Sequence, residues 1–539
     1  MRRRRAFLAA GNCAELADCL DVDSGDDDDT GDDDVPPDAF KCSDLGLSER
    51  EFVDAEDDAA LYATAADFTV PTTNGDWNFK EHWTGCETYL FIQDRPRQTS
   101  GWPIPLWDRD VDTFLDRLPD NAHVFFVTIW PEEADREEAL AAMMETVDAY
   151  LEKLTQDERD RWWHRIHYVT DAASALDGWL GEIMTNPSWG VGIDRFQRVR
   201  YIGSYADYSR YDSNKGWFAP NLAMAANEPV YYNFESDRDE RMTAEGAEVV
   251  TLFDGDELSD PGWAGARGYA EVALPDDMDS FDALELDLYL GCVGTGEYGT
   301  CPAWDYIVEL YLCDKDDPDT CDMEIGRWIT TYHREGRWAH DISAMLPLLA
   351  DGGTRRFAFY TQQPYEVRLD LRFYERAKGP RPVETTYLFS GGAFDANYNT
   401  DRDPVVVSIP EDAAKVELAV VISGHGQVSP GNCAEFCKTT HHFYVNGEEN
   451  VVEFPEAGTN TGCMDQVADG AVPNQYGTWW YGRSGWCPGK EVPMRMIDVT
   501  AQVTPGGDAT FEYEGLYGGD AYTGSGADIR LDSWVVVSK

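Results

Sequence analysis

The chain has 539 residues, with 101 acidic side chains against 43 Lys and Arg, which gives a formal net charge of −58. This excess excludes a nucleic-acid binder, because phosphate recognition needs clustered basic side chains. A hydrophobic content of 43% excludes a wholly disordered chain, and no apolar run approaches the ~20 residues of a membrane-spanning helix. The length predicts about three domains. The acidity indicates a solvated surface, of which a salt-adapted, halophilic surface is the more specific form.

The N-terminus has the features of an export segment. The sequence MRRRRAFLAAGNC combines an arginine-rich start with a short apolar run, and it resembles a truncated signal or a lipoprotein signal ending at Cys13. The even number of 12 cysteines favours disulfides, and therefore a secreted or outer-surface protein. Residues 20–38, LDVDSGDDDDTGDDDVPPD, predict an extended linker because like charges repel. We expect residues 1–55 to hold the signal or lipid anchor and this linker.

Residues 56–238 alternate between strand-like and helix-like segments, which predicts a parallel α/β layer. The strand-like segments are 89–93, 123–130 and 165–171, and the helix-like segments are 110–118 and 137–154. The stretch NPSWGVGIDRFQRVRYIGS (186–204) predicts two short strands after a proline, and it resembles the distal hairpin of thioredoxin-like and redoxin domains. In that family a reactive cysteine pair follows the first strand. Here that place holds SGWP (100–103), and Cys86 precedes the strand. We therefore expect a thioredoxin-like domain without the redox chemistry.

From about residue 240 onward, helical patterning is almost absent. Short segments alternate apolar with polar residues between turns, which predicts strands; they are 269–274, 283–290, 306–312, 356–361, 367–374, 416–423 and 442–447. A break falls near AKGPRP (377–382). The region is long enough for two sandwiches or jelly rolls, which we place at 239–380 and 381–539. The predicted fold class is mainly β, preceded by the α/β domain.

Four segments of this β region resemble the peptide-N-glycosidase F family, bacterial secreted amidases that remove N-linked glycans from asparagine. They are CPAWD (301–305), EIGRWITTY (324–332) leading to RFAFYTQ, ISGHG followed by NCAEFCKTTHHFYVN (422–446), and RSGWCPGKEVPMRMIDV (483–499). They occur in the family's order and cover roughly residues 245–539. The resemblance implies two adjacent eight-stranded antiparallel jelly rolls, in agreement with the strand pattern.

The resemblance also implies disulfides. Three pairs match the family, Cys292 with Cys301, Cys433 with Cys437, and Cys463 with Cys487; Cys313 and Cys321 bracket the turn DKDDPDT and predict an extra local pair. The unassigned cysteines are Cys13, Cys19, Cys42 and Cys86.

Hydrolysis of a carboxamide needs a base that activates water and groups that polarise the carbonyl. Asp305 falls where the family has its principal catalytic aspartate, and Glu435 falls on its second essential carboxylate. Gln362 occupies the position of a third family carboxylate, and an amide can keep a hydrogen bond but cannot take a proton. We therefore expect catalysis by Asp305 and Glu435, with Gln362 hydrogen-bonding the substrate amide.

The expected substrate-binding residues follow from the same four segments. They are Arg483, Trp304, His425, Gln427 and Trp486. Several positions depart from the family: His425 replaces a tryptophan, Gln427 a histidine, Tyr306 an arginine and Pro364 a tryptophan. Each assignment has an alternative: Asp305 could be a solvated surface group, Glu435 a cap of its loop, Arg483 a partner of one carboxylate, and Trp304 part of the core.

The leading hypothesis is a monomeric, metal-independent amidase without a cofactor that acts on N-linked glycopeptides or glycoproteins. A second hypothesis is a non-catalytic carbohydrate-binding or surface-interaction protein on the same fold. A remote third is a copper monooxygenase-like protein, by analogy of fold alone. Against copper, only nine histidines occur, and the adjacent His441 and His442 would point to opposite faces of a strand. The GxG at 294–296 lacks a following helix, and the chain has neither a GxSxG nor an HExxH motif.

Overall fold

The computed structural model describes residues 41–93, 111–185, 190–201, 222–259, 265–293, 301–377, 379–400, 402–426, 433–475 and 477–539. Five sequence predictions lie outside these residues: the export segment with Cys13 and Cys19, the linker at 20–38, SGWP at 100–103, the GxG at 294–296, and Gln427. Apart from the first 41 residues, the chain forms one unit, from Cys42 to Lys539. No helix within the described ranges is both long and apolar enough to cross a membrane.

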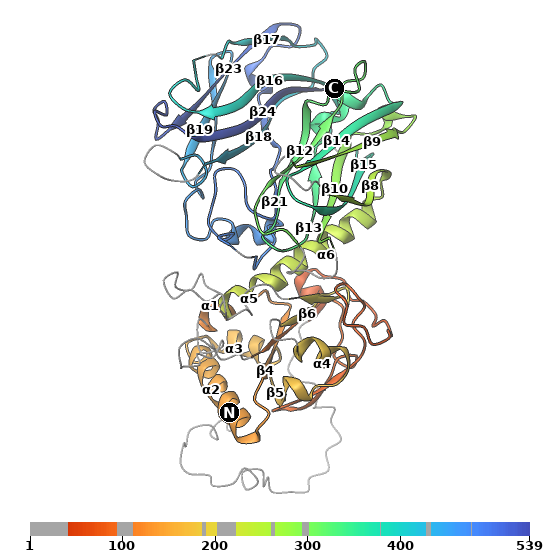
Figure 1. Ribbon diagram of the computed structural model, residues 1–539, viewed down its shortest axis with the longest axis vertical. Coiled ribbons are helices and arrows are strands. Elements are labelled where there is room, and N and C mark those ends of the chain that lie inside the picture. Colours follow the sequence, from red (N-terminus) through yellow and green to blue (C-terminus); the bar gives the residue numbers. More distant parts are fainter. Residues whose placement is uncertain are drawn as a thin grey trace. The chain divides into compact units, whose positions relative to one another are not determined.

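The first part of this unit is an α/β structure around a seven-stranded sheet with the order β2-β1-β5-β4-β3-β6-β7 (Figure 1). Its strands are β1 (Thr69–Thr72), β2 (Gly75–Asn78), β3 (Thr88–Gln93), β4 (Ala122–Thr128), β5 (Ile166–Ala172), β6 (Val191–Ile193) and β7 (Val199–Tyr201). Its helices are α1 (Val111–Arg117), α2 (Glu133–Leu151), α3 (Gln156–Trp163) and α4 (Gly178–Thr185).

The three central strands β3, β4 and β5 are parallel, as the alternating sequence pattern predicts. Every residue of β3 and β4 is buried, because the sheet has a hydrophobic core on each face. Phe126 belongs to the core that includes α1 and α2, whereas Phe125 belongs to the core that includes α4. The antiparallel β6 and β7 form the two short strands predicted in 186–204. The assignment of this domain as thioredoxin-like stays a prediction.

The α/β domain begins before residue 56, where the sequence analysis placed the end of the linker. Cys42, in the short 3-10 helix η2 (Cys42–Leu45), forms a disulfide with Cys86. The ring of Phe52 packs edge-on against Phe79, with the ring centroids 5.4 Å apart. These covalent and packing contacts attach residues 42–55 to the domain.

Two helices that the sequence analysis did not predict follow the α/β domain, the short α5 (Leu222–Ala225) and the long α6 (Asn227–Glu245). The reason lies in the buried face of α6, which mixes charged residues with apolar and aromatic ones instead of forming a purely apolar stripe. Glu228 pairs with Arg334 of the β region at 3.0 Å, and Glu235 pairs with Arg200 of β7. Ion pairs therefore interrupt the hydrophobic periodicity that identifies a helix from sequence.

The next part is an antiparallel sandwich of the strands β8 to β15. They are β8 (Glu248–Leu258), β9 (Ala266–Ala273), β10 (Ala283–Gly291), β11 (Ile307–Leu312), β12 (Met323–Ile329), β13 (Gly336–Asp341), β14 (Thr354–Thr361) and β15 (Tyr365–Tyr374), with the 3-10 helices η8 (Met278–Ser280) and η9 (Ser343–Leu349). One sheet has the order β13-β10-β15-β8 and the other β12-β11-β14-β9. This distribution of eight strands is that of a jelly roll.

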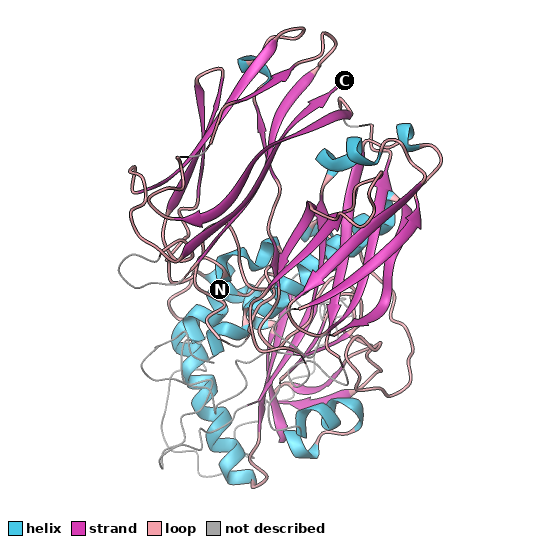
Figure 2. Cartoon of the chain, turned by 45° about the horizontal axis from the view of Figure 1, so that its top comes forward, coloured by secondary structure: helices cyan, strands magenta, loops and turns pink. Residues whose placement is uncertain are grey.

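The last part repeats the same topology. Its strands are β16 (Pro382–Phe394), β17 (Val405–Ser408), β18 (Lys415–His425), β19 (Thr439–Val445), β20 (Glu448–Glu453), β22 (Arg495–Asp498), β23 (Asp508–Tyr517) and β24 (Ala527–Ser538), with the 3-10 helices η10 (Met464–Asp469) and η11 (Thr500–Gln502). The sheets have the orders β16-β24-β18-β22 and β17-β23-β19-β20. Strands predominate in both jelly rolls (Figure 2), and the prediction of two eight-stranded antiparallel jelly rolls is confirmed.

One strand crosses between the jelly rolls. The two-residue β21 (Lys490–Glu491) lies in sequence within the second jelly roll, but it pairs with β12 of the first. The loop that carries Arg483 therefore lies in sequence between the second jelly roll and a strand added to the first.

Candidate active site

A cavity of about 520 Å³ is lined by residues of both jelly rolls. The first jelly roll contributes residues near the ends of β11 and β14, and the second contributes residues of β16, β18 and β24. The lining residues are Asp305, Tyr306, Ile307, Gln362, Gly392, His425, Asp528 and Arg530. Three residues singled out from the sequence, Asp305, Gln362 and His425, thus line one cavity.

Arg483 connects the two predicted catalytic carboxylates. Its Nη2 lies 3.4 Å from Oδ2 of Asp305, and its Nε lies 3.3 Å from Oε1 of Glu435. The guanidinium also donates hydrogen bonds to backbone carbonyls, the shortest being 2.9 Å to Tyr481. Arg483 is only 1% exposed. A buried guanidinium therefore links Asp305 to Glu435 and holds both carboxylates in place.

The sequence analysis expected Arg483 to contact the sugar, and this role stays a prediction. The side chain is covered, and its N–H groups face the two carboxylates and the carbonyls of its own loop. A longer contact within that loop is the 3.3 Å hydrogen bond to the carbonyl of Thr478. Arg483 thus holds the two carboxylates and is not among the residues that line the cavity.

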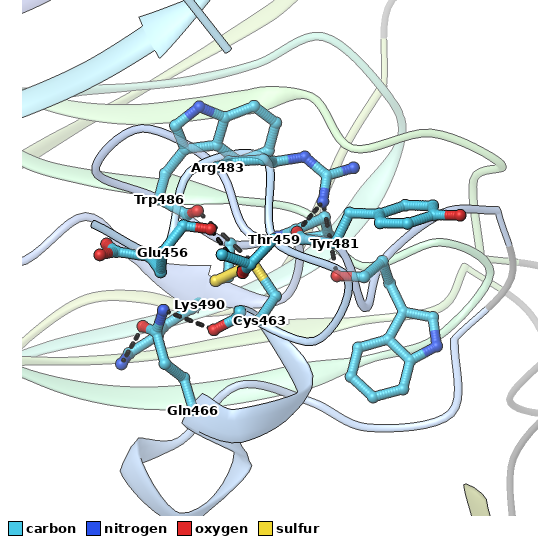
Figure 3. The surroundings of a disulfide bond; sticks show 12 residues. Glu456, Thr459, Cys463, Gln466, Tyr481, Arg483, Trp486 and Lys490 are labelled. Carbon is cyan, nitrogen blue, oxygen red and sulfur yellow. Dashed lines mark hydrogen bonds between the residues drawn. A yellow bond between two sulfur atoms is a disulfide. The ribbon is translucent and has the colours of Figure 1, made fainter. Parts of the chain in front are cut away.

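Disulfides fix the loops that carry these groups. The Cys463–Cys487 bond closes the loop in which Arg483 lies, and Figure 3 shows Arg483 beside Trp486 there, with the guanidinium carbon 4.8 Å from the ring centroid. Glu435 lies between Cys433 and Cys437, which are also bonded. The backbone N–H of Ser484 donates to the carbonyl of Glu435 at 2.8 Å, which joins the two loops.

The remaining disulfides agree with the sequence and add one pair. Those found are Cys292–Cys301, whose second cysteine is the first residue of CPAWD, Cys313–Cys321 at the turn, and Cys42–Cys86, which pairs two of the unassigned cysteines.

Both carboxyl groups have pKa values above their usual range. Burial raises the pKa of Asp305, although Arg483 and a hydrogen bond from Tyr332 favour the charged form. Burial also raises the pKa of Glu435; Arg483 lowers it, and the charge of Asp305 raises it again. The charge of Asp305 therefore influences the ionisation of Glu435, an arrangement suited to proton transfer. Tyr332 was missed from sequence, although it ends the family-like segment EIGRWITTY.

His425 is held by a hydrogen-bond chain behind the cavity. Its Nε2 lies 2.8 Å from Oγ of Ser423, which in turn accepts a hydrogen bond from Arg327 at 3.1 Å. The imidazole stacks on Trp486 with the ring centroids 5.2 Å apart. Burial and the positive charges of neighbouring arginines lower the pKa of His425 to about 3; these are Arg327, Arg530 and Arg483. His425 is therefore a neutral hydrogen-bonding group at neutral pH.

The two predicted tryptophans occupy different environments. Trp304 is 59% exposed, while its backbone carbonyl accepts a hydrogen bond from Thr330 at 2.7 Å. Its ring is thus available to a ligand. Trp486 is buried, and its indole N–H donates to the carbonyl of Gly424 at 2.7 Å, so it supports His425 from behind.

Arg530 is a cavity residue that the sequence analysis missed. Its Nη1 lies 3.3 Å from Oε1 of Glu309, and its Nε lies 3.4 Å from Oδ1 of Asp528. The family resemblance implies an arginine at position 306, where this chain has tyrosine. Here a guanidinium reaches the cavity from β24, more than 200 residues later in sequence, so no local motif could indicate it. Within the described ranges, no cluster of three or more His, Cys, Asp or Glu side chains is arranged to bind a metal ion.

The comparisons with known proteins agree with the family named from the four segments. Residues 394–536 match the family model of the peptide-N-glycosidase F C-terminal domain. The chain is 27% identical over 235 residues to a peptide-N(4)-(N-acetyl-beta-D-glucosaminyl)asparagine amidase F from Elizabethkingia miricola, which covers 40% of this chain and 63% of that protein. The match to the peptide-N-glycosidase F C-terminal family model lies in the second jelly roll, and the chain spans less than two thirds of the length of the curated relative that it resembles.

Solved structures similar to the chain include PNGase F, a glycosylasparaginase from Flavobacterium meningosepticum. It is 21% identical with a TM-score of 0.43, and the match covers 55% of this chain and 96% of that one. PNGF-II is 14% identical with a TM-score of 0.42, over 57% of this chain and 67% of that one.

Proposed function

We propose that the protein is a metal-independent amidase that hydrolyses the bond between asparagine and the first N-acetylglucosamine of N-linked glycopeptides or glycoproteins. The single observation that carries the proposal is the pairing of Asp305 and Glu435 through the buried Arg483, with Asp305 in the wall of the cavity. The relationship to an asparagine amidase F supports the same reaction class.

In the proposed mechanism Asp305 is the general base. Its carboxylate takes a proton from a water molecule, whose oxygen attacks the carbonyl carbon of the amide. The C–N bond then breaks, and the proton passes to the departing glycosylamine nitrogen. The products are an aspartate side chain and a glycosylamine. Gln362 lines the same cavity and would hydrogen-bond the substrate amide.

The surrounding residues set the properties of this base. The guanidinium of Arg483 stabilises the charged form of Asp305, and Glu435 pairs with the same guanidinium. Because the charge of Asp305 raises the pKa of Glu435, Glu435 is suited to share a proton during the reaction. The exposed ring of Trp304 is suited to stack on a sugar.

The test is release of glycan from a denatured N-glycoprotein, followed by gel shift and by mass spectrometry of the asparagine converted to aspartate. It is run at low and at molar salt, since the surface is highly acidic. The variant Asp305→Asn should lose at least about 100-fold in rate, because it removes the general base. The matched control is Asp279→Asn, whose side chain is 87% exposed. No release by the wild-type protein at either salt concentration would refute the amidase.

Gln362 favours a second candidate, a carbohydrate-binding protein without turnover. It lies in the cavity beside Asp305, at a position where the family resemblance implies a carboxylate, and it cannot take a proton. In this case the wild-type protein would bind a glycopeptide without cleaving it, and Asp305→Asn would leave the affinity nearly unchanged.

We also propose that the protein acts outside the cytoplasm. The structure contains the Cys42–Cys86 disulfide and the four further pairs, and such bonds persist in oxidising compartments. Detection of the protein in the culture medium or on the outer cell surface tests this location, and recovery only from the cytoplasm would contradict it.

A further inference from the structure

An array of tyrosines and arginines lies on one side of the sheet that contains β9, β14 and β11. We call it the Tyr–Arg face, and it consists of Arg267, Tyr269, Tyr311, Arg356 and Tyr360. Strands β14 and β9 are neighbours in this sheet, with β9 at its edge (Figure 1).

The strand register shows that these side chains share one side of the sheet. Tyr360 of β14 pairs directly with Arg267 of β9, and Ala358 pairs with Tyr269 on one side and with Tyr311 on the other. Directly paired residues point to the same side, as do residues two apart in one strand. Ala358 is fully buried and lies between the two tyrosines.

The same side of the sheet leads into the cavity. Gln362 follows Tyr360 by two residues, and Ile307 precedes Glu309, the residue paired with Tyr360 on β11. Both Gln362 and Ile307 line the cavity. At about 3.3 Å per residue, Tyr360 lies about 7 Å and Arg356 about 20 Å from Gln362 along the strand. The Tyr–Arg face therefore continues directly from the wall of the cavity.

The side chains are arranged as aromatic and guanidinium pairs. The guanidinium carbon of Arg267 lies 5.7 Å from the ring centroid of Tyr311 and 5.8 Å from that of Tyr360. That of Arg356 lies 4.6 Å from the ring of Tyr269, which is 51% exposed. Rings and guanidinium groups therefore lie as neighbours on this side of the sheet, which also carries Glu271 opposite Arg356 and Glu309 opposite Tyr360.

Arg267 has no acidic partner among the residues that the structure describes, in a chain with 101 acidic residues. It is exposed on β9, and the two tyrosine rings position it. Its N–H groups are therefore available as hydrogen-bond donors to a ligand. Arg356 differs, because it also pairs with Asp319 at 2.8 Å.

We propose that the Tyr–Arg face binds the sugars of an N-linked oligosaccharide that extend beyond the cavity, an inference that rests on the proposed function of the cavity. Tyrosine rings can cover the apolar faces of sugar rings, and arginine N–H groups can donate to sugar hydroxyls. Because the face begins at the cavity wall, one oligosaccharide can occupy both: its core chitobiose lies in the cavity, and its outer sugars lie along β14 and β9.

The experiment measures binding of two free sugars by calorimetry, a complete high-mannose oligosaccharide that ends in chitobiose, and chitobiose alone. Neither contains the amide bond, so neither is consumed. The double variant Arg267→Ala/Tyr269→Ala should bind the complete oligosaccharide about tenfold more weakly, which corresponds to ~1.4 kcal/mol. Its affinity for chitobiose should stay unchanged. Both residues are exposed, and their removal leaves the core intact.

The matched controls are Arg368→Ala and Tyr517→Ala, exposed residues of the same types outside the face, with exposures of 60% for the Arg368 side chain and 42% for Tyr517. They should bind both sugars like the wild-type protein. The inference is overturned if the wild-type protein binds the complete oligosaccharide no more tightly than chitobiose, if it binds neither, or if the double variant binds like the controls.

Glycan release by the wild-type protein separates this outcome from the proposed function. Release without any effect of the double variant on binding rejects the Tyr–Arg face and keeps the amidase. Binding that depends on the face, without release, rejects the amidase and keeps the face as a sugar-binding surface.

Discussion

Replacement of Arg483 by methionine tests the central contact of the site. Methionine keeps an unbranched side chain of similar reach but removes the positive charge. In the variant Asp305 and Glu435 would remain close together with no guanidinium between them. Each of these carboxylate side chains is only 17% exposed, so water would replace the lost partner incompletely.

The structure sets the size of the effect. Two unit charges 3.4 Å apart attract by about 5 kcal/mol at an effective dielectric constant of about 20. The cost of burying Arg483 offsets part of this attraction in the wild-type protein. Because removal of one partner leaves buried charges uncompensated, we expect Arg483→Met to lower the free energy of unfolding by ~3–5 kcal/mol at pH 7.

The loss of unfolding free energy in Arg483→Met should depend on pH. Arg483 lowers the pKa of both carboxyl groups, so its removal raises these pKa values further above those of the unfolded chain. A carboxyl group with a raised pKa binds its proton more tightly in the folded state, and this contribution is lost as pH rises through the raised pKa. The difference between variant and wild type should therefore be larger at pH 7 than at pH 5.

The assay is urea unfolding followed by tryptophan fluorescence at pH 5 and pH 7, at one ionic strength. The control Arg368→Met removes an arginine whose side chain is 60% exposed, and it should change the free energy by less than about 0.5 kcal/mol. If Arg483→Met lowers the free energy of unfolding no more than the control does, the stabilising contact of Arg483 with Asp305 and Glu435 is refuted. A large loss of equal size at both pH values would show that the carboxylates are not the groups left uncompensated.

Three further predictions concern the ionisation of Asp305 and the loop behind it. Tyr332→Phe removes a hydrogen bond to the charged form of Asp305, so the acid limb of the pH dependence of kcat/KM should move upward by up to about one pH unit; an unchanged midpoint would contradict this role. Gln362→Glu adds a negative charge to the same cavity and should also move the acid limb upward, whereas a downward shift would show that the two groups do not interact. Replacement of Cys463 and Cys487 by serine should destabilise the protein by ~3 kcal/mol, because the bond spans 24 residues; thermal unfolding measures the loss, and an unchanged melting temperature would argue against that cross-link.

The sequence predicted the strands well where burial on one or both faces imposes a regular pattern. The central strands β3, β4 and β5 lie at the expected apolar runs, and β10 begins at the expected residue, Ala283. The sequence did not predict helix α6, because its buried side chains Glu228 and Glu235 are charged and form ion pairs. A hydrophobic pattern can reveal apolar burial, but it cannot reveal an ion pair whose partner is distant in sequence.

In the candidate active site, too, local motifs could be read from the sequence, whereas contacts between distant residues could not. Short motifs identified Asp305, Glu435 and Arg483, and the cysteines around them marked the loops that hold them. The sequence did not show that Arg483 lies between the carboxylates, since the distance between residues 305 and 483 in space is set by the packing of two jelly rolls.

The sequence by itself predicted the fold class from its strand pattern, and it predicted the disulfide-bonded loops and the candidate site residues from short motifs that resemble a known family. Only the tertiary structure decided that Arg530 enters the cavity from β24, and that tyrosines and arginines of β9, β11 and β14 lie side by side. The physical reason is that strand pairing in a jelly roll joins segments far apart in the chain, so the chemistry of a surface depends on register as well as on composition.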